Sequence, residues 1–231
     1  MLYFIHGLNG NPKNWHPSLD FFQKQGFSCK AIDLRDNVNL KKTNVEDYIR
    51  KVGNLVDNDD VLIGHSMGGL IVQKVAESKK IKAGICLCSA PPRGIRFKFI
   101  SIPHLKYIPF ILFNRPFKVS YQLAKELLFN CVSEKEAIIA YKQLKKESAK
   151  VTFQVMMNKV VVDQQRIKAP LFFIAAEQDK ASPPVLVEKI ADKYDAQVRV
   201  VPGCHYIFAD IDPINQEIAN ILQQIQYAPD L

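Results

Sequence analysis

The chain alternates short apolar runs with segments in which apolar residues recur every three or four positions. The first pattern is typical of strands buried on both faces of a sheet, and the second is typical of amphipathic helices. Strands are predicted at 2–5, 27–33, 61–63, 82–90, 171–176 and 197–201, and helices at 14–25, 45–56, 70–76 and 213–227. Strands that alternate with helices of this length predict an α/β fold, with a mostly parallel sheet and right-handed crossovers.

The alternation stops between Pro91 and about Gln164. This section is rich in Phe and Tyr, and its periodicity predicts helices at 120–131, 133–147 and 151–161. We interpret it as a helical cap, residues 91–164, inserted into a core domain made of residues 1–90 and 165–231.

A G-x-S-x-G pattern centred on Ser66 lies between the apolar run 61–63 and a helical segment. A glycine-softened turn is the plainer interpretation of such a pentapeptide. The strand-turn-helix context instead predicts a nucleophile elbow, in which a strained serine is held at the carboxyl end of a strand. Gly64 and Gly68 have no Cβ, so neighbouring backbone can approach closely. The helix N-terminus adds free N–H groups and a partial positive charge near the serine.

The first strand runs directly into His6, Gly7 and Leu8. An acyl-transfer site needs two backbone N–H donors for its oxyanion. Met67, which follows the serine, and Leu8 are the predicted donors. Alternatively, His6 only ends the strand and Gly7 only turns the chain. The candidates for the substrate pocket are His6, Trp15 and His65, although a tryptophan at a helix start is more often simply buried.

Two further loops complete a candidate triad. Asp179 follows the apolar run 171–176, and His205 follows the last predicted strand in a Gly-containing loop. The chain order Ser66, Asp179, His205 is the order expected for a serine hydrolase on such a sheet. Each residue alone has an ordinary loop interpretation. Asp33 and Asp163 are weaker candidates for the acid, and we interpret Cys204 as incidental.

Composition restricts the class of protein. The chain has 231 residues, 48% of them apolar, which suits one α/β domain with an insertion. It has no apolar run long enough to span a membrane and no signal-peptide pattern, so a cytoplasmic location is expected. The five cysteines contain no CxxC pair and are expected to be buried free thiols rather than a disulfide framework. No metal-ligand spacing occurs among the histidines.

The net charge of +8 belongs to the predicted cap, which has thirteen basic and five acidic residues, whereas the remainder is balanced. The plainest interpretation is a solvated outer face. A second is an apolar acyl pocket with cations that attract an anionic substrate. A third is contact with a membrane surface through residues 97–113, where prolines at 103 and 109 prevent a span. Nucleic acid is the least favoured partner because no binding motif accompanies the charge.

The motifs HGLNG, GHSMGG, EQD followed by SPP, and GCH resemble together those of the α/β-hydrolase superfamily, in its capped branch of small esterases and lipases. The resemblance implies Ser66 as nucleophile, Asp179 as acid, His205 as base, and Leu8 and Met67 as oxyanion donors. By this resemblance the sequence starts at the position of the family's third strand, and a sheet without the family's first two strands is expected. The cap is not of a type that indicates a substrate.

These features predict a serine hydrolase that cleaves a carboxylic ester or thioester of an apolar acyl or aromatic substrate through an acyl-enzyme, with no cofactor and no metal. The alternatives are an acyltransferase with the same triad, or a ligand-binding receptor with an idle triad. A dehalogenase is disfavoured because that branch carries Asp where Ser66 stands. A hydroxynitrile lyase is disfavoured because Tyr206, rather than Lys, follows the histidine.

Overall fold

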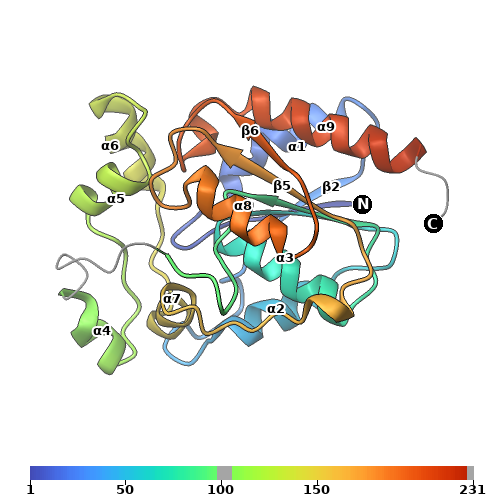
Figure 1. Ribbon diagram of the computed structural model, residues 1–231. Coiled ribbons are helices and arrows are strands. Elements are labelled where there is room, and N and C mark those ends of the chain that lie inside the picture. Colours follow the sequence, from blue (N-terminus) through green and yellow to red (C-terminus); the bar gives the residue numbers. More distant parts are fainter. Residues whose placement is uncertain (98–105, 228–231) are drawn as a thin grey trace.

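The computed structural model describes residues 1–97 and 106–227. Its centre is a six-stranded sheet in the order β2-β1-β3-β4-β5-β6, in which every neighbouring pair is parallel (Figure 1). The strands are β1 (Leu2–Ile5), β2 (Cys29–Ile32), β3 (Val61–His65), β4 (Ala83–Leu87), β5 (Leu171–Ala176) and β6 (Val198–Val201). The predicted α/β class and parallel sheet are therefore confirmed.

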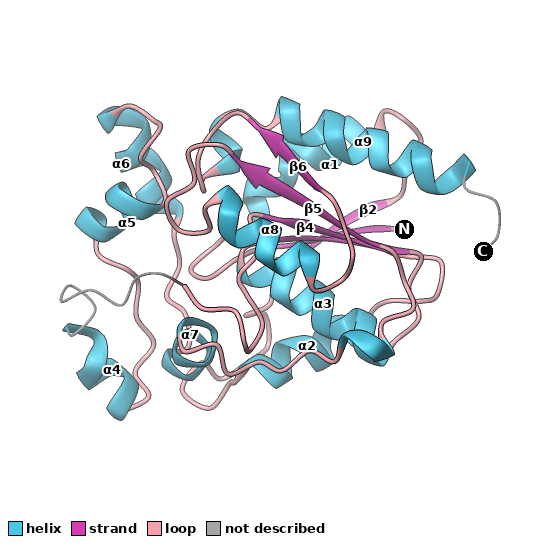
Figure 2. Cartoon of the chain, viewed as in Figure 1, coloured by secondary structure: helices cyan, strands magenta, loops and turns pink. Residues whose placement is uncertain are grey.

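Helices cover both faces of the sheet (Figure 2). One face carries α1 (His16–Gln23) and α9 (Asp212–Tyr227), and the other carries α2 (Val45–Gly53), α3 (Met67–Ser78) and α8 (Pro184–Asp192). Because successive strand residues point to opposite faces, Leu62 and Ile63 of β3 belong to two different apolar clusters. These two clusters are the core on either side of the sheet.

The segment between β4 and β5, residues 91–164, is called the insertion below and contains α4 (Ile108–Leu112), α5 (Tyr121–Leu127), α6 (Glu134–Gln143) and α7 (Ala149–Met156). Val151 and Val155 of α7 belong to the core cluster that also contains residues of α2 and α3. The helix predicted at 133–147 ends early because Leu144 is extended and Glu147 pairs with Phe117 in an antiparallel bridge. Residues 98–105 of the segment considered for membrane contact lie outside the described residues. None of the described helices has the length and apolarity needed to cross a bilayer.

The expectation that all cysteines are free thiols is wrong for two of them. Cys131, between α5 and α6, forms a disulfide with Cys204, which is 73 residues further along the chain. Cys29, Cys86 and Cys88 are free. The fold of the insertion brings the two partners together, and no spacing rule in the sequence reveals a contact of that separation.

Candidate active site

Ser66 occupies a strained turn between β3 and α3. Its φ of 55° and ψ of −117° place a non-glycine residue in a region that costs about 1–3 kcal/mol. The sheet holds it there, since its N–H donates to the Leu87 carbonyl at 2.9 Å and its carbonyl accepts from Ala90 at 3.0 Å. A Cβ on Gly64 would lie 2.3 Å from the Gly68 carbonyl group, so the turn requires glycine at that position.

The structure brings Ser66, Asp179 and His205 together. His205 Nδ1–H donates to Asp179 Oδ2 at 2.7 Å, and His205 Nε2 lies 3.0 Å from Ser66 Oγ. Asp179 and His205 are both buried, while Ser66 is partly accessible. The bond to Asp179 fixes the tautomer that leaves Nε2 free to accept the serine proton.

The loop after β5 holds the Asp179 carboxylate in its ionised form. Burial alone would raise the pKa of Asp179, but the neighbouring His205 and hydrogen bonds to the carboxylate outweigh it and lower that pKa. Asp179 Oδ1 accepts the backbone N–H groups of Ala181 and Ser182, each at 2.8 Å. Asp179 therefore stays negatively charged and can stabilise a protonated His205 ring.

Cys88 lies beside Asp179, and nothing in the sequence around it indicates a place in the site. It follows β4 with a φ of 46°. Its Sγ lies within 4.8 Å of a carboxylate oxygen of Asp179 and of a ring nitrogen of His205. Burial, then the charge of Asp179, raises the pKa of the Cys88 thiol well above its usual value. A protonated thiol beside an acid and a histidine that already bond each other is a poor metal site. It is better placed as a weak donor to the carboxylate.

His65 supports the histidine loop from below. Its Nε2–H donates to the His205 carbonyl at 2.9 Å, and the two rings lie 4.8 Å apart. Burial, followed by the proximity of His205, lowers the pKa of His65 to about 3. His65 is therefore neutral at ordinary pH and serves as a hydrogen-bond donor.

The loop after β1 approaches the serine closely. A Cβ on Gly7 would lie 2.8 Å from the Ser66 Cβ, which places the backbone of this loop against the elbow. Within the described residues, the N–H groups of Leu8 and Met67 have no backbone or side-chain acceptor. The loop is held by His6, whose Nδ1–H donates to the Gly7 carbonyl at 2.9 Å and whose Nε2 accepts from Leu34 at 3.1 Å.

Asn9 ties the same loop to the insertion. It is buried with a φ of 55°, and its amide donates to the carbonyls of Phe117 at 3.1 Å and Lys145 at 2.8 Å. The Lys145 N–H donates back to the Asn9 carbonyl at 2.9 Å. The two residues that Asn9 bonds belong to the two strand-like segments joined by the Phe117–Glu147 bridge.

A buried ion pair lies behind this contact. Glu147 accepts from Arg35 at 3.3 Å and from the Tyr48 hydroxyl at 2.6 Å, and Arg35 also donates to the Gly10 carbonyl. Burial and the charge of Glu147 raise the pKa of Tyr48 well above its ordinary value, so the hydroxyl stays a donor. Glu147 of the insertion is therefore linked to α2 through Tyr48 and, by way of Arg35, to the loop after β1.

Trp15 is fully buried in the core cluster that contains Phe4, and it packs edge-on against Phe208. His6 and His65 are buried as well. All three therefore support the loops of the site from behind in this structure, and none presents an open surface.

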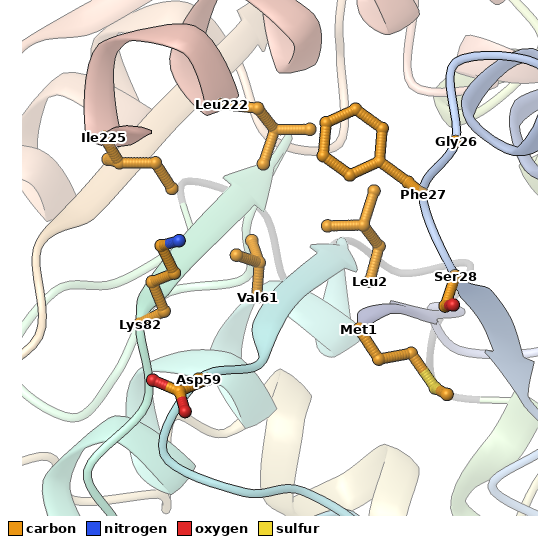
Figure 3. Close-up of a pocket in the computed structure, with 10 residues that line it drawn as sticks. All are labelled: Met1, Leu2, Gly26, Phe27, Ser28, Asp59, Val61, Lys82, Leu222 and Ile225. Carbon is orange, nitrogen blue, oxygen red and sulfur yellow. The ribbon is translucent and has the colours of Figure 1, made fainter. Parts of the chain in front are cut away.

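The pocket in Figure 3 lies at the opposite end of the sheet. It is lined by Leu2 and Val61, which begin β1 and β3, and by Phe27 and Leu222. Ser66 instead follows the carboxyl end of β3, which is the edge where ligands bind on open α/β sheets. A second pocket, lined by Gln178, Gly203, Tyr206 and Cys131, flanks the acid and histidine loops from outside.

The parallel sheet, the serine at its elbow and the Ser-Asp-His order together define an α/β protein of the hydrolase type. A model of the Alpha/beta hydrolase family matches residues 2–216, so the chain belongs to this family. Comparison with curated protein sequences found no match.

Solved structures share the fold at low identity. An extracellular α/β-hydrolase from a Paenibacillus species, described as sharing structural and functional homology to tobacco salicylic acid binding protein 2, has a TM-score of 0.78 and 17% identity, over 97% of this chain and 98% of its own. A methylesterase from Arabidopsis has a TM-score of 0.71 and 15% identity, over 99% and 100%. Tomato methylketone synthase I, in complex with 2-tridecanone, has a TM-score of 0.72 and 15% identity, over 97% and 98%.

Proposed function

We propose that this protein is a serine hydrolase that cleaves a carboxylic ester or thioester through an acyl-enzyme. The observation that carries the proposal is the unbroken chain of short contacts from Ser66 Oγ through His205 to the buried Asp179. Geometry of this kind is how a weak nucleophile is activated by an adjacent oriented base.

In the proposed reaction Ser66 Oγ attacks the carbonyl carbon while its proton passes to His205 Nε2. Asp179 stabilises the imidazolium without taking the proton. When the tetrahedral intermediate collapses, the bond to the alkoxide or thiolate breaks and that group leaves with the proton from Nε2. Water then attacks the acyl-serine, gives its proton to His205, and the second collapse returns the proton to Ser66.

The negative charge on the carbonyl oxygen would be accepted by the N–H groups of Leu8 and Met67. Both are unpartnered within the described residues, and both belong to loops that meet at Ser66. The start of α3 adds the positive end of a twelve-residue helix. Loss of one such donor typically costs about 10²–10³ in kcat.

The proposed substrate is an ester of an apolar acyl or aromatic group, with residues 91–164 acting as the cap. The insertion contains two apolar clusters with aromatic members. They reach the loops of the site through Phe117, whose carbonyl accepts from Asn9, and through Phe129, whose ring centroid lies 5.1 Å from that of Tyr206. The fold neighbour named as a methylesterase supports an ester substrate, and the one in complex with 2-tridecanone supports an apolar one. Small esters or thioesters are therefore the substrates to test first.

The proposal is tested by intact mass after treatment with a fluorophosphonate, followed by hydrolysis of p-nitrophenyl esters of increasing acyl length. One adduct is expected on the wild type and none on Ser66→Ala, with turnover lowered by about 10⁴ or more. Ser78→Ala, at the exposed end of the same helix, is the matched control and should keep both.

An adduct that persists on Ser66→Ala would place the nucleophile elsewhere and overturn the proposal. Ligand binding by folded wild type without adduct or turnover would favour the receptor alternative. An acyl-enzyme that passes its acyl group to an added alcohol in preference to water would favour an acyltransferase.

A further inference from the structure

Large apolar side chains are exposed at one corner of the insertion. Leu112, the last residue of α4, and Phe113 after it are 71% and 70% accessible, the highest values among large apolar residues in the described ranges. Ile108 and Phe110 of the same helix are also exposed. Exposed apolar patches of this kind mark binding surfaces more often than single exposed residues do.

The corner is anchored rather than loosely attached. Phe117 stacks on Tyr107 with ring centroids 4.8 Å apart and contacts Phe110 at 5.5 Å. Ile111 packs into the same small cluster. One side of α4 is therefore fixed to the protein, and its other residues point away from it. Figure 1 shows α4 at the outer end of the insertion, beside α7 and remote from the C-terminus.

The charged residues near this corner in the sequence are all basic. No Asp or Glu occurs between Glu77 and Glu126 in the sequence. Lys106 precedes α4 and Arg115 follows it, and both are exposed. Arg115 lies 5.8 Å from the centre of the Phe113 ring, so the cation and the apolar tip are adjacent. An apolar tip with a cationic rim matches an anionic lipid surface, which offers an apolar interior beneath negative headgroups.

We propose that α4 and Phe113 insert into the surface of an anionic lipid bilayer, with Lys106 and Arg115 at the headgroups. The binding is peripheral, since α4 is only five residues long and reaches no deeper than the boundary of headgroups and acyl chains, about 5–10 Å. This surface is separate from the triad, and its use does not depend on the proposed hydrolysis.

The test is co-sedimentation of the full chain with large vesicles of phosphatidylcholine alone or with 30% phosphatidylglycerol. The Ser66→Ala protein serves as the reference background, so that no turnover alters the lipid. The protein is expected to bind the anionic vesicles, and this binding should weaken at high salt. Leu112→Asp with Phe113→Asp should lower the partition coefficient at least tenfold, because two apolar side chains no longer enter the bilayer.

Val185→Asp with Val200→Asp is the matched control, since both positions are exposed on the core. It adds the same charge and should bind as the reference does. Lys106→Gln and Arg115→Gln should each lower binding to anionic vesicles about fivefold and leave binding to phosphatidylcholine unchanged. All variants should keep the circular dichroism spectrum of the reference protein.

Three results would overturn the proposal. The first is no binding to anionic vesicles by the folded reference protein. The second is equal binding by the Leu112/Phe113 double variant and the reference. The third is a dimer in size-exclusion chromatography that the double variant converts to a monomer, because the patch would then be an interface between copies of this chain.

Discussion

The disulfide offers the sharpest test of how the insertion is held to the core. Cys131 is exposed and Cys204 is fully buried beside His205. Cys131→Ala therefore removes the cross-link at its exposed end and leaves Cys204 as a small buried thiol. Little packing is lost at position 131, so the change isolates the effect of the cross-link on the unfolded chain.

The magnitude follows from the loop that the bond closes. For a separation of 73 residues, the chain-entropy model gives a stabilisation of about 4 kcal/mol at 25 °C. For a chain of this size each kcal/mol moves the melting temperature by about 2–4 °C. Cys131→Ala, or reduction of the wild type, should therefore lower the melting temperature by on the order of 10 °C.

Thermal melts with and without reductant measure the stabilisation, and thiol titration in denaturant measures whether the bond is formed. Denatured wild type should titrate three thiols before reduction and five after it, as one bond among five cysteines requires. Five thiols without reductant, or a variant that melts with the wild type under oxidising conditions, would refute the reasoning. The cytoplasmic location stays a prediction, and a bond of this kind is typical of oxidising compartments.

Three further changes probe the site. The pKa of His65 in the folded protein, about 3, lies below its value in the unfolded chain. The free energy of unfolding should therefore fall as the pH drops below about 6.5, by at most about 1.4 kcal/mol per pH unit. Urea midpoints of His65→Gln should fall less steeply with pH than those of the wild type, and equal slopes would contradict the lowered pKa. Asn9→Gly allows the positive φ but removes the two hydrogen bonds of the Asn9 amide. The value of kcat should therefore drop about tenfold with little change in KM. A rise in KM alone would count against a role of Asn9 in placing the loop after β1. Gly64→Ala should lower the free energy of unfolding by more than about 4 kcal/mol or prevent folding. Gly53→Ala has open space at its Cβ and should raise the free energy of unfolding by about 0.5–1 kcal/mol in urea. Equal effects of the two changes would contradict the close packing at Gly64.

The fold could be predicted from the sequence because its signals are local. Apolar runs such as 61–63 and 171–176 are buried strands, and the segments between them are helices. In a parallel sheet all carboxyl ends meet at one edge. Residues that follow β3, β5 and β6 therefore come together however far apart they lie in the chain. That is why Ser66, Asp179 and His205 could be selected from their positions relative to predicted strands.

The remaining contacts of the site could not be predicted because they join the insertion to distant loops. Glu147 looks like one acid among many lysines, and nothing near it in the sequence shows that it is buried against Arg35 and Tyr48. The extended segment that carries it also shortened the helix predicted at 133–147. Asn9 and the Cys131–Cys204 bond were missed for the same reason, since their partners lie 73 to 136 residues away.

These long-range contacts converge on three of the four loops at the site. The insertion holds the loop after β1 through Asn9 and the loop after β5 through the Asn130 amide, which donates to the Gln178 carbonyl at 2.9 Å. It holds the loop after β6 through the bond between Cys131 and Cys204. The Leu128 carbonyl adds a second contact to the histidine loop by accepting the N–H of Tyr206 at 2.9 Å. The serine elbow is held from the sheet side, where the Ser66 N–H donates to the Leu87 carbonyl at the end of β4. The insertion is therefore part of the framework that sets the distances between the proposed catalytic groups. Substitutions that loosen it should change kcat even where no substrate contact is lost.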